Sequence, residues 1–150
     1  MKFDFDKIMR AMGLVLIGAA VTLLLCPKAK ADTRIGVHIA SYHDPKMGYN
    51  NVNPGLYIYK DGWTAGTYYN SERRQSFYGG YTFEGELIGP VSWGLTVGLI
   101  TGYSRAKVLP MVVPTLSIPD RILGGTVRVA FIPPVSKGAA AIHLSHEWRF

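Results

Sequence analysis

The sequence predicts an all-β fold, an eight-stranded antiparallel transmembrane β-barrel, on three observations. Everything after residue 31 is a series of short alternating runs divided by turn signals, without a convincing helical period. The clearest run, Val91 to Tyr103, carries large apolar side chains on one face and small ones on the other. The last run, Ala139 to Phe150, is mostly apolar on one face and polar on the other, and it ends in an aromatic residue. A narrow membrane barrel requires this pattern, because large residues face lipid and small ones fit the lumen.

Residues 1–31 are predicted to be a cleaved signal peptide, which leaves residues 32–150 as the barrel domain. A basic head precedes the apolar run Ala11 to Cys26, and Ala29-Lys30-Ala31 places small residues at both positions that a signal peptidase recognises. An uncleaved anchor helix is the alternative, but this apolar run is short for a membrane span. Cleavage before Asp32 would also remove the single cysteine, so we expect no disulfide in the barrel.

The net charge of +6 does not indicate nucleic-acid binding. Five of the 16 basic residues lie in the predicted signal peptide, which leaves 11 basic against 8 acidic residues, or +3, in the barrel. The longest basic cluster there is Arg73-Arg74. We therefore expect no surface that follows a phosphate backbone.

Alternation and turn signals together predict eight strands. Asp61-Gly62 is a strong two-residue hairpin signal, and an even strand count places both ends of the barrel domain on the periplasmic side. The expected outer loops are residues 41–54, 70–75, 102–107 and 133–138, and the expected inner turns are 61–62, 87–90 and 119–124. The strands are Arg34 to Ala40, Gly55 to Lys60, Trp63 to Tyr69, Ser76 to Glu84, Val91 to Tyr103, Val108 to Ile118, Gly125 to Ile132 and Ala139 to Phe150.

A few polar residues could carry chemistry. His38 and Ser71 are expected near the same outer end with one strand between them, at a backbone separation of about 10 Å. A base and a hydroxyl in such a position could act together as a functional pair, although both residue types are usually structural. His143 and His146 are three positions apart, so they lie on opposite faces of a strand and cannot bind one metal together. We expect no metal site and no cofactor.

Several segments occur in an order and spacing that resemble the lipid A palmitoyltransferase family (PagP). They are Tyr69-Asn70-Ser71, the run from Tyr78 to Glu84, Gly94 to Gly98 with Thr101-Gly102, Val108 to Pro114, Phe131-Ile132-Pro133 and Trp148-Arg149-Phe150. Members of this family are small outer-membrane barrels that move an acyl chain from a phospholipid onto lipid A. The resemblance runs from His38 to Phe150 and is weaker in the first half.

The resemblance implies catalytic roles for three residues. His38 falls on the family's essential histidine, and Asn70 and Ser71 fall on its Asp-Ser pair. Since Asn70 carries no charge, this chain departs from the family at the residue that would stabilise an imidazolium. Asp44 in the first outer loop is an alternative carboxylate, and Asn70→Asp is expected to raise the rate.

The resemblance also implies substrate-binding positions. Thr82 falls on the position that sets acyl length and shares an inward face with Tyr78 and Gly80, so a larger residue there should shorten the chain accepted. Pro110 and Pro114 cannot donate to a strand ladder, which leaves the wall locally open. In the family, such proline-weakened seams admit lipid sideways from the outer leaflet.

We therefore expect a monomeric outer-membrane acyltransferase that takes membrane lipids, with a phospholipid as donor and lipid A as acceptor. The main alternative is a non-catalytic outer-membrane barrel that binds lipid or modifies the cell surface. A secreted soluble calyx is a further alternative, but its glycine-rich face would then point to solvent.

Overall fold

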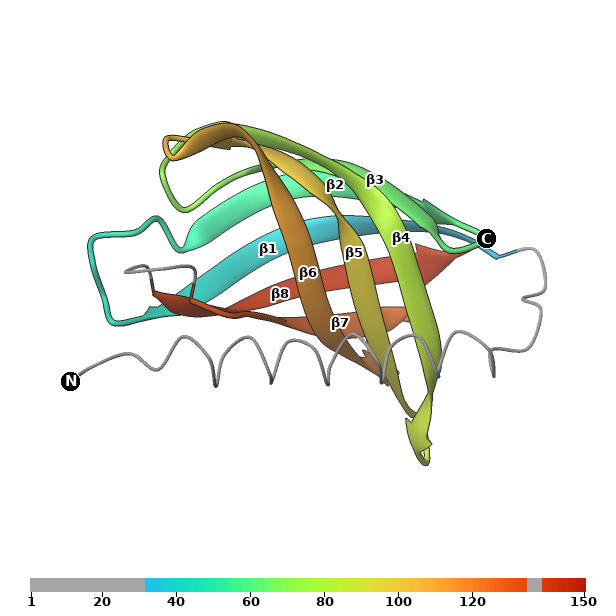
Figure 1. Cartoon of the computed structure of the whole chain (residues 1–150). Helices are drawn as coiled ribbons and strands as arrows, with labels where there is room; N and C mark the ends of the chain where they lie inside the picture. The colour runs from blue at the N-terminus through green and yellow to red at the C-terminus, as the bar shows by residue number, and fades with distance from the viewer. Residues whose placement is uncertain (1–31, 135–138) are drawn as a thin grey trace, which may run out of the picture.

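Eight antiparallel strands close into a barrel in the computed structural model, which describes residues 32–134 and 139–150 (Figure 1). Consecutive strands are neighbours, and the last strand pairs with the first. The predicted all-β, eight-stranded antiparallel barrel is confirmed, whereas the predicted signal peptide lies outside the described residues. The strands are β1 (Thr33–Asp44), β2 (Val52–Lys60), β3 (Trp63–Tyr69), β4 (Gln75–Ile88), β5 (Val91–Tyr103), β6 (Ala106–Pro119), β7 (Thr126–Ile132) and β8 (Ala140–Arg149).

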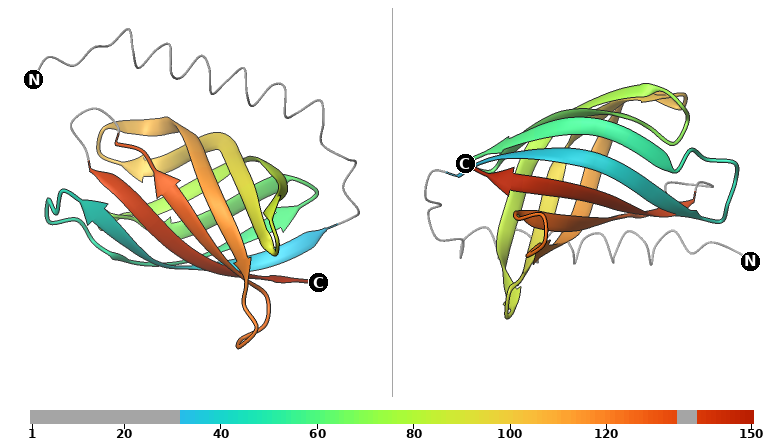
Figure 2. Two further views of the ribbon diagram at one scale, coloured as in Figure 1. Left: turned by 90° about the horizontal axis from the view of Figure 1, so that it is seen from below. Right: turned by 180° about the vertical axis from the view of Figure 1, so that it is seen from behind.

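Asp32 and Phe150 lie at the same end of the barrel (Figure 2). The backbone N–H of Phe150 donates to the carbonyl of Thr33 (3.0 Å), and that of Asp61 donates to the carbonyl of Asp32 (3.1 Å). Asp61 and Gly62 form the predicted two-residue hairpin with φ angles of 51° and 92°, as a type I′ turn requires. We call this the inner end and the opposite end the outer end.

The first outer loop is shorter than expected, because β1 continues to Asp44 and β2 begins at Val52. Pro54 interrupts the alternating pattern in the sequence, but it lies within β2 at a point where the β1–β2 ladder is irregular. His38 pairs with Gly55 and Ala40 with Val52, so the β1–β2 register shifts where the missing proline N–H would have been needed. The prediction of a loop from residue 41 to 54 was wrong for this reason.

The strand β4 also runs past its predicted end at Glu84, to Ile88. Its last residues pair with the start of β5, including Gly85 with Trp93 and Glu86 with Ser92. Glu84, the last residue of the predicted strand, points inward and pairs with Arg34 and Arg128.

The barrel is polar inside and apolar outside. Among the described residues, five buried residues are hydrophobic and fourteen are polar or charged. Large apolar side chains lie on the outer face of every strand, among them Ile35, Leu56, Phe77, Leu99, Val112, Phe131 and Ile142. This distribution is the reverse of a water-soluble core. No helix of the described residues is long and apolar enough to cross a membrane.

Candidate active site inside the barrel

His38 points from β1 into the barrel and lies among aromatic rings. Its ring centroid is 5.1 Å from that of Tyr57, 5.0 Å from Tyr68, 5.6 Å from Tyr78 and 5.0 Å from His143. Both ring nitrogens are hydrogen-bonded. Nδ1 lies 2.8 Å from Nε2 of His143, and Nε2 lies 3.0 Å from the Tyr78 hydroxyl.

The hydrogen bonds of His38 belong to a longer chain that ends at Ser41. Nδ1 of His143 lies 2.8 Å from Oγ of Ser41, so four side chains are connected from Tyr78 through His38 and His143 to Ser41. His143 is buried, and Ser41 is half-buried. In a hydrogen bond between two imidazole nitrogens, one nitrogen carries the proton and the other accepts it. Only one of Nδ1 of His38 and Nε2 of His143 is therefore protonated.

Ser41 shares the inward face with His38 because β1 is irregular between them. Residues three positions apart on a regular strand lie on opposite faces. The register of β1 shifts between His38 and Ala40 against both of its neighbours, and this shift returns Ser41 to the interior opposite His143. A strict alternating pattern could not find Ser41, and the only available signal was the proline in the partner strand.

Asn70 is fully buried, and both the nitrogen and the oxygen of its side-chain amide form hydrogen bonds. The amide nitrogen donates to Oγ of Ser76 and to the carbonyl of Gly102, both at 2.9 Å. The amide oxygen accepts from the backbone N–H groups of Glu72 (2.9 Å) and Arg74 (3.0 Å). Asn70 therefore holds the β3–β4 loop in shape, and its bonds are directed at that loop, at the start of β4 and at β5.

Ser71 lies farther toward the outer end than His38. His38 is level with Tyr68, because it pairs with Gly55 and Gly55 pairs with Tyr68. Three residues at about 3.3 Å per residue place Ser71 about 10 Å farther along the barrel. The structure thus brings Tyr78 to His38 but gives both ring nitrogens partners other than Ser71 and Asn70. Asp44 is exposed at the end of β1.

Tyr78, Gly80 and Thr82 share the inward face of β4. Thr82 is buried, and its hydroxyl lies 2.9 Å from that of Thr96 on β5. Gly80 pairs with Gly98, and a Cβ atom added to Gly80 would lie 2.8 Å from Cα of Gly98 and 2.3 Å from the carbonyl oxygen of Val97. Side-chain atoms are excluded there by the close approach of β4 and β5.

The barrel wall is incomplete between β6 and β7. Their pairing runs only from Thr115 with Ala130 to Pro119 with Thr126, so Pro110 and Pro114 lie in the part of β6 that pairs with β5 alone. An apolar pocket of about 510 Å³ lies at the point where the pairing stops. It is lined by Phe83, Trp93, Gly94, Leu95, Pro114, Thr115, Leu116, Val129, Ala130, Phe131 and Ile142.

The pocket lies beside the hydrogen-bonded chain. Ala130 lines the pocket, and its pairing partner on β8 is His143. His143 in turn pairs with Ser41 on β1. One residue that lines the pocket, Ala130, is therefore the cross-strand neighbour of His143.

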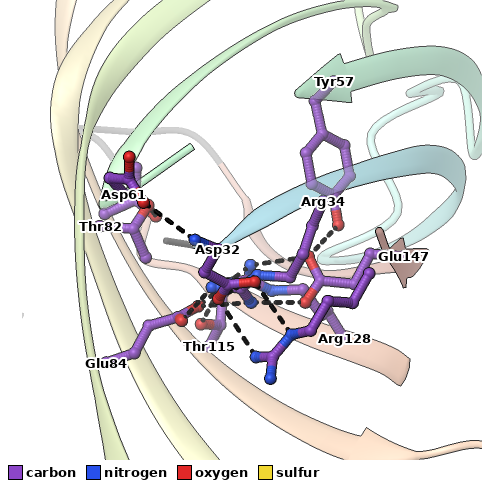
Figure 3. Close-up of polar contacts among 11 residues, drawn as sticks. Asp32, Arg34, Tyr57, Asp61, Thr82, Glu84, Thr115, Arg128 and Glu147 are labelled. Carbon is purple, nitrogen blue, oxygen red and sulfur yellow. Dashed lines mark hydrogen bonds and ion pairs between the residues drawn. The ribbon is translucent and has the colours of Figure 1, made fainter. Parts of the chain in front are cut away.

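An ionic cluster fills the lumen on the inner side of this site (Figure 3). Glu147, which is 2% exposed, accepts from Arg34 (2.7 Å), Arg128 (3.1 Å) and the Tyr57 hydroxyl (3.0 Å). Glu84 pairs with the same two arginines, and Asp32 pairs with Arg34 at 3.1 Å. Residues from β1, β4, β7 and β8 thus bind one another across the interior. This cluster was not predicted from the sequence, although its charges occupy inward positions of their strands.

The two histidines of β8 lie on opposite faces, as predicted. His143 faces the lumen, whereas the His146 ring contacts Trp148 (centroids 4.4 Å apart) and Asp120 (3.1 Å from Nε2). Within residues 32–134 and 139–150, no group of three or more His, Cys, Asp or Glu side chains is arranged to hold a metal ion.

Comparison with known proteins gives no identification. The sequence matches no model of a protein family and no curated protein.

Proposed function

We propose that this chain is an outer-membrane acyltransferase that moves a fatty acyl chain from a phospholipid to lipid A or another outer-leaflet lipid. The observation that carries this proposal is the apolar pocket between β6 and β7, one of whose lining residues, Ala130, is the cross-strand partner of His143. An acyl chain is the kind of ligand that suits an almost wholly apolar pocket open to the side of a barrel.

Placement in a membrane is supported by the outer surface of the barrel. Its apolar side chains point outward from all eight strands, and aromatic residues flank them toward both ends. Trp63, Tyr81 and Phe83 form a contiguous group near the inner end, while Tyr42, Tyr69 and Phe77 are exposed toward the outer end. Aromatic girdles at both interfaces are typical of outer-membrane barrels.

The chemistry is supported by the imidazoles in the lumen and by the resemblance to the lipid A palmitoyltransferase family. Acyl transfer needs a hydroxyl, a base that takes its proton, and a group that orients the base. His38 falls on the family's essential histidine and here belongs to a hydrogen-bonded chain that contains a serine hydroxyl.

The alternative, a non-catalytic barrel that binds lipid or modifies the cell surface, is favoured by the position of Asn70. Its side-chain hydrogen bonds go to its own loop, to Ser76 at the start of β4 and to β5, and His38 is bonded to neither Asn70 nor Ser71. A non-catalytic barrel in which Asn70 served only to hold the β3–β4 loop would show the same hydrogen bonds.

Location is tested first. We expect the protein to fractionate with outer membranes and to show heat-dependent gel mobility in detergent. Recovery as a soluble periplasmic monomer would instead favour the secreted calyx and remove the basis of the acyltransferase proposal.

Activity is tested by mass spectrometry of lipid A and phospholipids from cells with and without the protein. Acyl transfer predicts a lipid heavier by one acyl chain together with a matching lysophospholipid. If an active preparation is obtained, Thr82→Gly should lengthen the acyl chain transferred. A folded, membrane-inserted protein that changes no lipid mass would favour the non-catalytic alternative.

A further inference from the structure

Ser41 and His143 face each other across the β1–β8 ladder and are joined by a 2.8 Å hydrogen bond. We propose that Ser41 is the nucleophile of the acyl transfer and His143 its general base, with His38 as a positioning residue. This assignment rests on the function proposed above, but it moves the reacting hydroxyl from Ser71 to Ser41.

The hydrogen bonds of the chain are consistent with a base at His143. If Ser41 donates its hydroxyl proton to Nδ1 of His143, then Nε2 of His143 carries a proton and donates it to Nδ1 of His38. His38 then carries its proton on Nε2 and donates to the Tyr78 hydroxyl. One tautomer of each imidazole satisfies all three bonds and leaves Nδ1 of His143 free to accept.

His38 has the role here that a carboxylate has in a serine triad. Its Nδ1 accepts from His143, which fixes the tautomer and ring orientation of the base. The rings of Tyr57, Tyr68 and Tyr78 surround His38 and restrict its movement. A neutral partner supplies orientation without a full negative charge, so this assignment needs no Asp in place of Asn70.

The pocket is the side from which we expect the acyl donor to approach this serine. Ala130 lines the pocket and pairs with His143, and His143 pairs with Ser41. Ser41 is half-buried, whereas His143 is buried. The hydroxyl is thus the more accessible member of the pair, as a nucleophile must be.

The reaction proceeds in two balanced steps. Oγ of Ser41 attacks the ester carbonyl carbon of the donor phospholipid while its proton passes to Nδ1 of His143. The ester C–O bond then breaks, and the lysophospholipid leaves with that proton, so that the acyl group remains on Ser41. In the second step a hydroxyl of the acceptor lipid attacks this acyl carbonyl and gives its proton to His143. The bond to Ser41 breaks, and Oγ recovers the proton.

The test uses the full-length protein, folded in detergent and checked by heat-dependent mobility. A long-chain alkyl fluorophosphonate should form an adduct on Ser41, identified by peptide mass spectrometry. Ser41→Ala should abolish the adduct and reduce lipid transfer by about a hundredfold or more, whereas Ser71→Ala should retain both. An adduct on Ser71, or transfer that survives Ser41→Ala, overturns the proposal.

If Ser41→Ala fails to fold, Ser41→Cys preserves the side-chain size. Its thiol should react with iodoacetamide faster than that of Ser71→Cys, because His143 deprotonates it. The chain's own cysteine, Cys26, lies in the predicted signal peptide and is reported by a separate peptide. Equal rates at the two thiols would contradict the role of His143.

The role of His38 is tested by the pH dependence of labelling. His38→Ala should slow labelling and change its pH profile, while His38→Asn, whose amide oxygen can accept from His143, should recover part of the rate. An unchanged pH profile would show that His38 is only structural and would overturn its role as the positioning residue. If Ser41 is labelled but no lipid is acylated, the site stands and the proposed function fails. If lipid is acylated but Ser41 is not needed, the proposed function stands and the assignment of Ser41 fails. If Ser41 is not labelled and no lipid is acylated, both the assignment and the proposed function are overturned.

Discussion

The side-chain amide of Asn70 donates to the carbonyl oxygen of Gly102 over 2.9 Å, across the outer end of the barrel from the β3–β4 loop to β5. A carboxylate in its place would set one oxygen against another. This bond therefore changes what we expect of Asn70→Asp, the substitution that restores the carboxylate found in the family that this chain resembles.

Asn70→Asp should destabilise the barrel by about 1–3 kcal/mol, because a buried donor is lost and a carbonyl is left unpaired. It should not raise the rate of lipid transfer. Urea unfolding in detergent measures the first effect and lipid mass spectrometry the second. Asn51→Asp is a matched control, since Oδ1 of Asn51 accepts from His43 and that bond survives the change. Higher transfer by Asn70→Asp with unchanged stability would contradict this expectation.

Glu147→Ala should be among the most damaging single substitutions in the barrel. It leaves Arg34 and Arg128 close together with less compensating charge in a buried site, at a cost of about 3–5 kcal/mol. The measurement is the urea midpoint of the detergent-folded protein. The exposed Glu86 on β4 provides the control, because Glu86→Ala removes the same charge where solvent screens it. Equal losses for the two variants would show that the cluster contributes little.

Ala130→Trp should place a large side chain between the pocket and His143 and so block the approach of the acyl donor. We expect lipid transfer to fall about tenfold, equivalent to ~1.4 kcal/mol in the barrier, while heat-dependent mobility is retained. Leu56→Trp introduces the same side chain at an exposed outward position on β2, away from the pocket, and should leave transfer unchanged. If both variants transfer at the wild-type rate, the donor reaches the site by another route.

Asp120 should make the segment between β6 and β7 sensitive to acid. The N–H groups of Ile122 (2.8 Å) and Leu123 (3.2 Å) donate to it and hold its pKa below the usual value, with a smaller contribution from His146. Its stabilising effect is thus present above the unfolded pKa and is lost as pH falls through the lowered folded pKa. Asp120→Ala should melt lower at neutral pH and converge with the wild type as pH falls through the lowered pKa of the Asp120 carboxyl. A constant difference in Tm across that range would exclude this role.

Alternation and turn chemistry were sufficient to predict the barrel. Trp63–Tyr69 and Val91–Tyr103 have the predicted bounds, and Asp61-Gly62 forms the expected turn. These features depend on local geometry that a short stretch of sequence determines. The errors arose where strand pairing overrides a local signal, as at Pro54 in the irregular β1–β2 ladder and at residues 85–88, which pair with the start of β5.

The candidate site was less accessible to such reasoning. His38 could be selected from the sequence, but its partner His143 comes from a strand 105 positions away in sequence. That Ser41 faces His143 could not be predicted without the register of β8 on β1. Ser41 depends on a single register shift that inverts the face expected from its distance to His38. Pairing register therefore decides this site, and residue type alone does not.

Three of the outer loops are joined to one another by hydrogen bonds that backbone N–H groups donate. The N–H of Asn50 donates to the carbonyl of Ser71 (2.9 Å), and the N–H of Ser104 donates to the carboxylate of Glu72 (2.7 Å). Three loops that are separate in sequence thus form one unit. An insertion in any of them would have to be accommodated by the other two, so these segments should diverge together among descendants of this protein, and a foreign epitope grafted into one loop alone should be poorly tolerated.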